Sequence, residues 1–149
     1  MPPFRLHTLL RLRIAERDER RADLAKALRA EEMLRAEQSR LAAEQAELAQ
    51  RERGLKSPGS ANVDALLSTH RYEVVLAAQA RQLSSQLTQV AAEIERRRLV
   101  LVEADRQVRV LEKLRERQAA AARIHEQRLD ARRYDELAMI GHSRKEAAL

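Results

Sequence analysis

The glycines and prolines of this chain leave two long stretches in which neither residue interrupts a helix. All six lie at Pro2, Pro3, Gly54, Pro58, Gly59 and Gly141. Residues 54–60 join a glycine, which often ends a helix, to a Pro-Gly pair typical of turns. We therefore predict one helix over about 4–53, a turn over 54–61 and a second helix over about 62–140. Three residues can cap the second helix, namely Ser60, Asn62 and Asp64.

Apolar residues recur in the second stretch with the period of a coiled coil. Alternating steps of four and three residues connect Leu83, Leu87, Val90, Ile94, Arg97, Leu101, Ala104, Val108 and Leu111. Only one Phe, two Tyr and no Trp are present and 35% of residues are charged, as in long helices. The periodic leucines argue against a disordered chain. We predict an all-α fold in which two long helices form an antiparallel coiled-coil hairpin, one domain over residues 1–149, with the second helix longer and projecting at the C-terminal end.

The first stretch carries leucines in two different phases. A seven-residue repeat connects Leu34, Leu41, Leu48 and Leu55, and another phase connects Leu10, Ile14, Leu24 and Leu28. This change predicts a stutter near Met33-Leu34. In the second stretch Arg97 is the one charged seam residue. We expect its stem to lie along apolar surface while its guanidinium reaches water.

Folding the chain about Ser57–Gly59 predicts how far the two helices overlap. Phe4 is expected near Glu112, so that residues after Lys113 project beyond the first helix by about 40 Å. The projecting part carries an apolar strip of Leu111, Leu114, Ala121, Ala122, Ile124 and Leu129. Because an isolated amphipathic helix is marginally stable in water, this strip predicts a binding partner.

The net charge of +6 is concentrated at the two ends of the chain. Residues 1–21 carry six Arg against three acids, and residues 113–149 carry nine Arg or Lys against six acids. An antiparallel hairpin brings both segments to one basic pole, which suits an acidic protein surface. Nucleic acid is disfavoured because aromatic interleaving and a recognition-helix module are missing from the sequence. A membrane surface is the other alternative for a basic pole.

No pattern for chemistry appears in the sequence. Cysteine is absent, and the histidines at positions 7, 70, 125 and 142 lack the spacing of metal ligands. The glycine-bearing loop lacks the spacing of a phosphate-binding loop. We predict no catalytic residue, cofactor, metal or small-molecule substrate, and hence no enzyme. The start of the chain lacks the pattern of a secretory signal, and no apolar run approaches the length of a membrane span.

The two ends of the chain carry residues in a distinctive order. The start reads Phe4-Arg5-Leu6-His7-Thr8-Leu9-Leu10-Arg11-Leu12-Arg13. Near the other end, Leu111–Gln118 reads LEKLRERQ and is followed by Ala119–Ala122, and beyond them stand Asp130 and Asp135-Glu136-Leu137-Ala138. These residues, about 10 at the start and 28 at the end, resemble the opening, the LEKLRER-type block and the tail of the FliJ family of the bacterial flagellar export apparatus.

The resemblance implies an interaction protein of the cytoplasm, peripheral to the inner membrane at the flagellar basal body. Family members are expected to act as a central stalk in the hexameric ring of the export ATPase FliI, to touch the export gate FlhA and to cycle export chaperones. For the ring, the resemblance and the basic pole point to Phe4, Leu6, Leu10, Arg13, Arg115, Gln118, Ala121, Ala122, Asp130, Asp135 and Glu136. For the gate, the expected exposed contacts are Tyr72, Leu76 and Leu83. Contact with the membrane is expected only indirectly, through the gate.

Two alternatives stay open at this point. The first is the injectisome counterpart of the YscO type, which has the same hairpin but other cargo. The second is a coiled-coil adaptor that uses its basic pole to bind nucleic acid or a membrane surface, with a steep loss of binding as salt rises.

Overall fold

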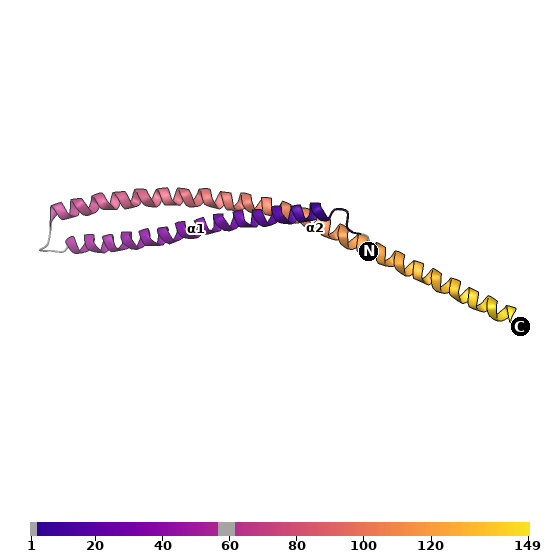
Figure 1. The fold of residues 1–149 in the computed structure, drawn as a ribbon. Helices are drawn as coiled ribbons and strands as arrows, with labels where there is room; N and C mark the ends of the chain where they lie inside the picture. Colours follow the sequence, from indigo (N-terminus) through magenta and orange to yellow (C-terminus); the bar gives the residue numbers. More distant parts are fainter. Residues whose placement is uncertain (1–2, 57–61) are drawn as a thin grey trace. The chain divides into compact units, whose positions relative to one another are not determined.

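Two long helices make up nearly all of the structure, a computed structural model that describes residues 3–56 and 62–149. Helix α1 spans His7–Leu55 and helix α2 spans Val63–Ala147 (Figure 1). No strand occurs in these described ranges. The prediction of an all-α fold with two packed helices, the second one longer, is confirmed. No helix among the described residues is long and apolar enough to cross a membrane.

The start of each helix has a local cause. Before α1, the amide of His7 donates to the carbonyl of Phe4 at 3.1 Å, so a turn precedes the helix and α1 begins three residues later than predicted. Before α2, the side-chain oxygen of Asn62 accepts the amide of Ala65 at 3.3 Å. Asn62 is therefore the cap, as one of the three candidates. The expected turn at Ser57–Gly59 and the candidate cap Ser60 lie outside the described residues.

Helix α2 continues past Gly141, so the predicted end near residue 140 is wrong. A single glycine costs a helix about 1 kcal/mol relative to alanine, which its neighbours in a long helix can offset. Apart from the adjoining residues and helix backbone, no atom lies within 4 Å of the position that a Cβ of Gly141 would take, so the glycine serves no close packing contact. Arg144 and Lys145 stand in the last turn, where positive charge favours the helix dipole.

The chain divides into two compact units, and both helices contribute to each. Unit 1 comprises Met1–Arg17 and Glu103–Leu149, and unit 2 comprises Asp18–Val102. In unit 2, the buried core consists of Leu41, Leu48, Leu76 and Leu83, with Leu34 and Ala80 packed against it. In unit 1, it consists of Leu10, Val108 and Leu111, with Phe4, Leu9 and Ile14 packed against it. Each core joins one α1 segment to one α2 segment.

The seam predicted for α2 is confirmed, because all nine of its residues from Leu83 to Leu111 are buried or half-buried. The stutter predicted for α1 is not observed. Burial in α1 continues across Met33 in steps of three and four, through Leu24, Ala27, Glu31 and Leu34. The leucine phase changes only because Ala27 and Glu31 fill seam positions where leucine would have made the repeat visible.

Arg97 bridges the two helices of unit 2. Its Nη1 donates to the backbone carbonyl of Asp23 in α1 at 2.5 Å, and its Nε donates to Glu93 at 2.7 Å. The guanidinium also turns across the seam to a polar acceptor, which the sequence does not predict, while the Arg97 side chain stays 30% exposed. Hydrogen bonds from Arg96 and then from Arg97 lower the pKa of Glu93 to about 2.

Candidate functional site

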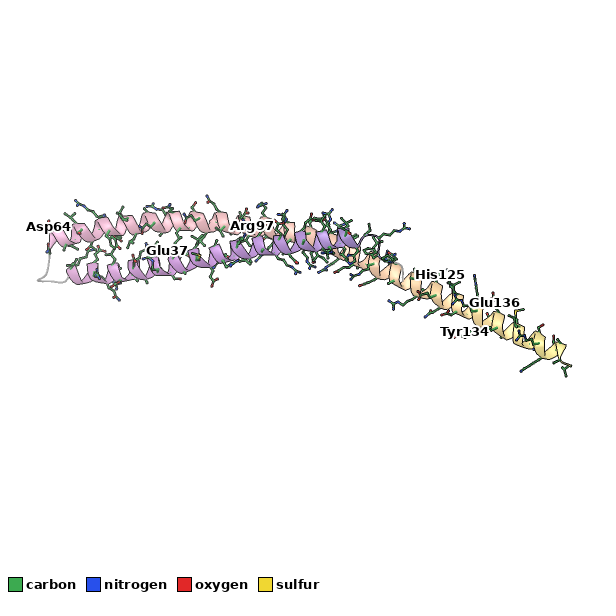
Figure 2. All side chains as sticks on the ribbon, viewed as in Figure 1. Glu37, Asp64, Arg97, His125, Tyr134 and Glu136 are labelled. Carbon is green, nitrogen blue, oxygen red and sulfur yellow. The ribbon has the colours of Figure 1, made fainter. Side chains whose placement is uncertain are left out.

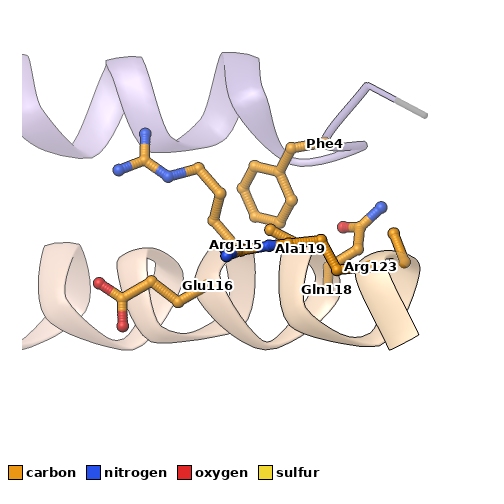
Figure 3. Close-up of a pocket in the computed structure, with 7 residues that line it drawn as sticks. Phe4, Arg115, Glu116, Gln118, Ala119 and Arg123 are labelled. Carbon is orange, nitrogen blue, oxygen red and sulfur yellow. The ribbon is translucent and has the colours of Figure 1, made fainter. Parts of the chain in front are cut away.

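The N-terminal segment of unit 1 forms a groove with α2. The ring of Phe4 stands over Ala119, in a cavity of about 330 Å³ (Figure 3). The lining residues are Phe4, Arg115, Glu116, Gln118, Ala119, Ala122 and Arg123, and we call this site the Phe4 groove. Apolar surface at its floor and charged groups around it suit the binding of a protein side chain.

The groove follows from three local features of the sequence. Phe4 precedes the start of α1, so its ring is free to turn toward α2. Ala119 and Ala122 have no bulk beyond Cβ, so the ring approaches the helix closely. Below them, Val108 is 0% exposed and packs with Leu10 and Leu111, which anchors the start of α1 on α2.

The contact of Phe4 lies further along α2 than the predicted pairing placed it. Ala119 stands about two helical turns beyond Glu112, the expected neighbour. The pairing assumed a fold centred on Ser57–Gly59. In unit 2, Gln45 and Leu48 share a cavity with Ala77, so the pairing there is displaced in the same sense. In consequence the part of α2 without a neighbour begins after Arg123 instead of after Lys113.

Residues 124–147, which we call the free helix segment, are all exposed. The side chains of His125, Tyr134 and Glu136 extend from α2 with no other described part of the chain beside them (Figure 2). Large apolar residues in this segment are Ile124, Leu129, Tyr134, Leu137, Met139 and Ile140. An exposed helix with this much apolar surface is typical of a binding region.

Positive charge gathers in unit 1. Its residues include 15 Lys or Arg against 10 Asp or Glu, a net charge of +5, whereas unit 2 has 14 against 13. Both of the basic stretches at the chain ends contribute to the same unit, apart from residues 18–21. The predicted basic pole therefore corresponds to unit 1, which also holds the Phe4 groove and the free helix segment.

Residues 2–147 match the family model described as Flagellar FliJ protein. The chain belongs to the FliJ family. Its membership agrees with the two-helix fold and with the residues at both ends that carry the resemblance. FliJ proteins are non-enzymatic components of flagellar protein export, and the chain takes this general role from its family. No curated protein and no solved structure matched the chain.

The residues expected to bind the ring of the export ATPase FliI fall into three groups in the structure. Four of them line the Phe4 groove, namely Phe4, Arg115, Gln118 and Ala122. Three stand in the free helix segment, namely Asp130, Asp135 and Glu136, of which Asp130 pairs with Arg133 at 3.5 Å. The other four belong to neither set. Leu6 and Ala121 are exposed, and Arg13 is paired with Glu16 at 2.9 Å. Leu10 is buried, so it supports this surface from below and offers no exposed contact itself.

The expected gate contacts do not form one surface. Tyr72 is 49% exposed, and its hydroxyl donates to Glu44 of α1 at 3.3 Å. Leu76 is only 1% exposed and Leu83 is also buried, both in the core of unit 2. The expectation that Leu76 and Leu83 are exposed contacts is therefore corrected, because both continue the seam. Binding of the gate by Tyr72 stays a prediction.

Sequence reasoning missed an outer apolar stripe on the first turns of α2. Val63, Leu67, Val74 and Val75 are about half exposed or more. The spacing of Val63, Leu67 and Val74 by four and seven residues was visible in the sequence and indicates one helix face. The inner seam of α2 has the same period, so spacing alone could not distinguish the exposed stripe from the seam.

No cluster of three or more His, Asp or Glu side chains that could hold a metal ion occurs in the part of the chain that the structure describes. His70 pairs with Glu73 and His142 pairs with Glu146, each within one helix turn on an exposed surface. The Phe4 groove and the free helix segment can both act as surfaces that bind other proteins.

Proposed function

We propose that this chain is a central stalk of the flagellar export ATPase FliI, which it binds through unit 1. The observation that carries the proposal is the free helix segment, a run of exposed helix that leaves six large apolar side chains without a neighbour. Packing of apolar side chains stabilises helices in proteins, so a partner that covers these side chains would be bound.

The Phe4 groove extends this surface to the start of the chain. Its apolar floor accepts a side chain from a subunit of the ring, and Arg115 and Arg123 at its edge attract acidic neighbours. The net charge of +5 in unit 1 speeds the encounter with an acidic lumen. Such steering would weaken with salt, whereas the apolar contacts would not.

A stalk of this kind acts by binding and not by chemistry. Two helices are not symmetric about their common axis, so subunits of a surrounding ring meet different side chains. A ring conformation that makes better contacts with the stalk gains population at the cost of the others. In this way the chain would stimulate ATP hydrolysis by the ring while it hydrolyses nothing itself.

The link to the export gate is proposed for the exposed face of unit 2. Tyr72 is the aromatic candidate, and Val74 and Val75 are exposed close to it in sequence. Aromatic side chains with apolar neighbours are common anchors of protein interfaces. Export chaperones are the further partners. The chain would act in the cytoplasm beside the inner membrane, which it would reach only through the gate.

The proposal is tested by a pair of substitutions that add the same charge to opposite faces of one helix turn. Ala122→Glu puts a carboxylate into the Phe4 groove, and the matched control Ala120→Glu puts one on an exposed face that does not line it. We expect the groove variant to bind FliI at least about tenfold more weakly and the control to bind like the unchanged chain. Circular dichroism of both variants verifies the helices.

The same two variants distinguish the stalk from a nucleic-acid binder. Binding of a generic RNA should be weak, lost with salt and equal in both variants if it reflects charge alone. If Ala122→Glu leaves FliI binding intact, and RNA binding is tight and weakened equally by both variants, the stalk proposal is wrong and the basic surface has another partner.

A further inference from the structure

One face of the free helix segment repeats apolar and charged residues in a palindromic order. Leu129, Arg133, Glu136 and Ile140 follow each other at steps of four, three and four, which puts them on one side of α2. Leu129 is 38% exposed and Ile140 is 51% exposed. Reading toward the C-terminus, the face is apolar, basic, acidic and apolar.

We propose that two copies of this chain pair through their free helix segments in an antiparallel orientation. In a two-fold symmetric pair, Leu129 of each copy meets Ile140 of the other, and Arg133 of each copy meets Glu136 of the other. A parallel pair would set Arg133 against Arg133 and Glu136 against Glu136. Charge complementarity therefore selects the antiparallel arrangement.

The length of the free helix segment fits this pairing. The centre of symmetry falls between Tyr134 and Asp135, midway between the end of the Phe4 groove at Arg123 and the end of α2 at Ala147. Ala122 of one copy then stands opposite Ala147 of the other, where two small side chains permit close approach.

The interface is expected to be weak and to depend on concentration. Only two large apolar residues per copy lie in the centre of the face, which is less than a permanent coiled coil uses. The crossed Arg133 and Glu136 pairs specify orientation more than they add affinity, because both groups lose water when they are covered. Each also replaces a local partner, such as the exposed contact of Arg133 with Asp130.

A charge swap in the full-length chain tests the proposal by sedimentation equilibrium over a wide range of protein concentration. Arg133→Glu alone sets two carboxylates facing each other on each side of the centre, and Glu136→Arg alone sets two guanidinium groups facing each other. Each single variant is expected to raise the dimer dissociation constant at least about tenfold. The double variant Arg133→Glu with Glu136→Arg is expected to restore the original value, since it only exchanges the two members of each pair.

Cysteine cross-linking tests the orientation independently, because the chain contains no cysteine of its own. Leu129→Cys and Ile140→Cys, mixed and oxidised, should form a disulfide-linked heterodimer, while each variant alone should not. A chain that stays monomeric at every concentration, a double charge variant that does not recover, or self-linking of Leu129→Cys alone would overturn the proposal. Pairing covers the same free helix segment that FliI is proposed to bind, so a paired chain would have to separate before that segment enters the ring. These experiments use this chain alone, so their failure leaves the binding of FliI untouched, and a failure of FliI binding leaves the pairing untouched.

Discussion

Replacing Leu76 with alanine should destabilise the hairpin as a core substitution does. Leu76 is 1% exposed and belongs to the core of unit 2 with Leu41, Leu48 and Leu83. Leu76→Ala removes three buried carbon groups, and about 0.8 kcal/mol for each gives about 2.4 kcal/mol. A seam between two helices is open at its sides and can partly close, so the additional cost of a cavity is small. We expect a loss of about 2.5 to 3 kcal/mol in the free energy of unfolding.

The matched control is Leu67→Ala, the same chemical change on the outer face of the same helix. Leu67 is 52% exposed, so its truncation should cost less than about 1 kcal/mol, helped by the higher helix propensity of alanine. Urea denaturation followed by far-UV circular dichroism gives both free energies, provided that the slope with urea stays equal between variants. Equal losses for Leu76→Ala and Leu67→Ala would refute the assignment of Leu76 to the core.

Three further predictions concern single positions in α2. Arg97→Leu should raise the free energy of unfolding by about 1 kcal/mol in urea denaturation, because leucine fills the seam and the Asp23 carbonyl keeps its helical hydrogen bond. A clear loss of stability would show that the hydrogen bond from Arg97 to Asp23 itself stabilises the fold. The pKa of Glu93 is lowered to about 2, so its pairing with Arg96 and Arg97 stabilises the fold above the pKa of about 4.3 in the unfolded chain and is lost as the pH falls toward 2. The stability difference between the unchanged chain and Glu93→Gln should shrink over this range, and a difference that is constant with pH would contradict it. Gly141→Ala should stabilise the helix around residue 141 by up to about 1 kcal/mol, because the added Cβ has open space around it. Amide hydrogen exchange around residue 141 should then become slower, whereas unchanged exchange would indicate that the helix ends before Gly141.

The helices themselves could be predicted because their determinants are local. The seam of α2 depends on residue spacing alone, and its nine positions are all covered in the structure. The cap at Asn62 depends on the three residues that follow it. The end of α2 is predicted too early if Gly141 is taken to terminate the helix. One glycine destabilises a helix only slightly, so α2 continues to Ala147.

The candidate site was harder to predict because it depends on register between helices. Phe4 lies beside Ala119 and not beside Glu112, and spacing within either helix does not contain this difference. Leu76 and Leu67 illustrate a second ambiguity. Both belong to apolar repeats of the same period in α2, and only packing against α1 decides which repeat becomes core and which stays on the surface.

The role of unit 1 as a stalk is tested most directly by steady-state ATP hydrolysis of FliI, titrated with this chain. The comparison is a version that ends at Arg123, which keeps the Phe4 groove and lacks the free helix segment. We predict that the full-length chain raises the turnover of the ring saturably and that the shortened version does not. Equal stimulation by both, or none by either under conditions in which the ring assembles, would contradict the proposal that the free helix segment acts inside the ring.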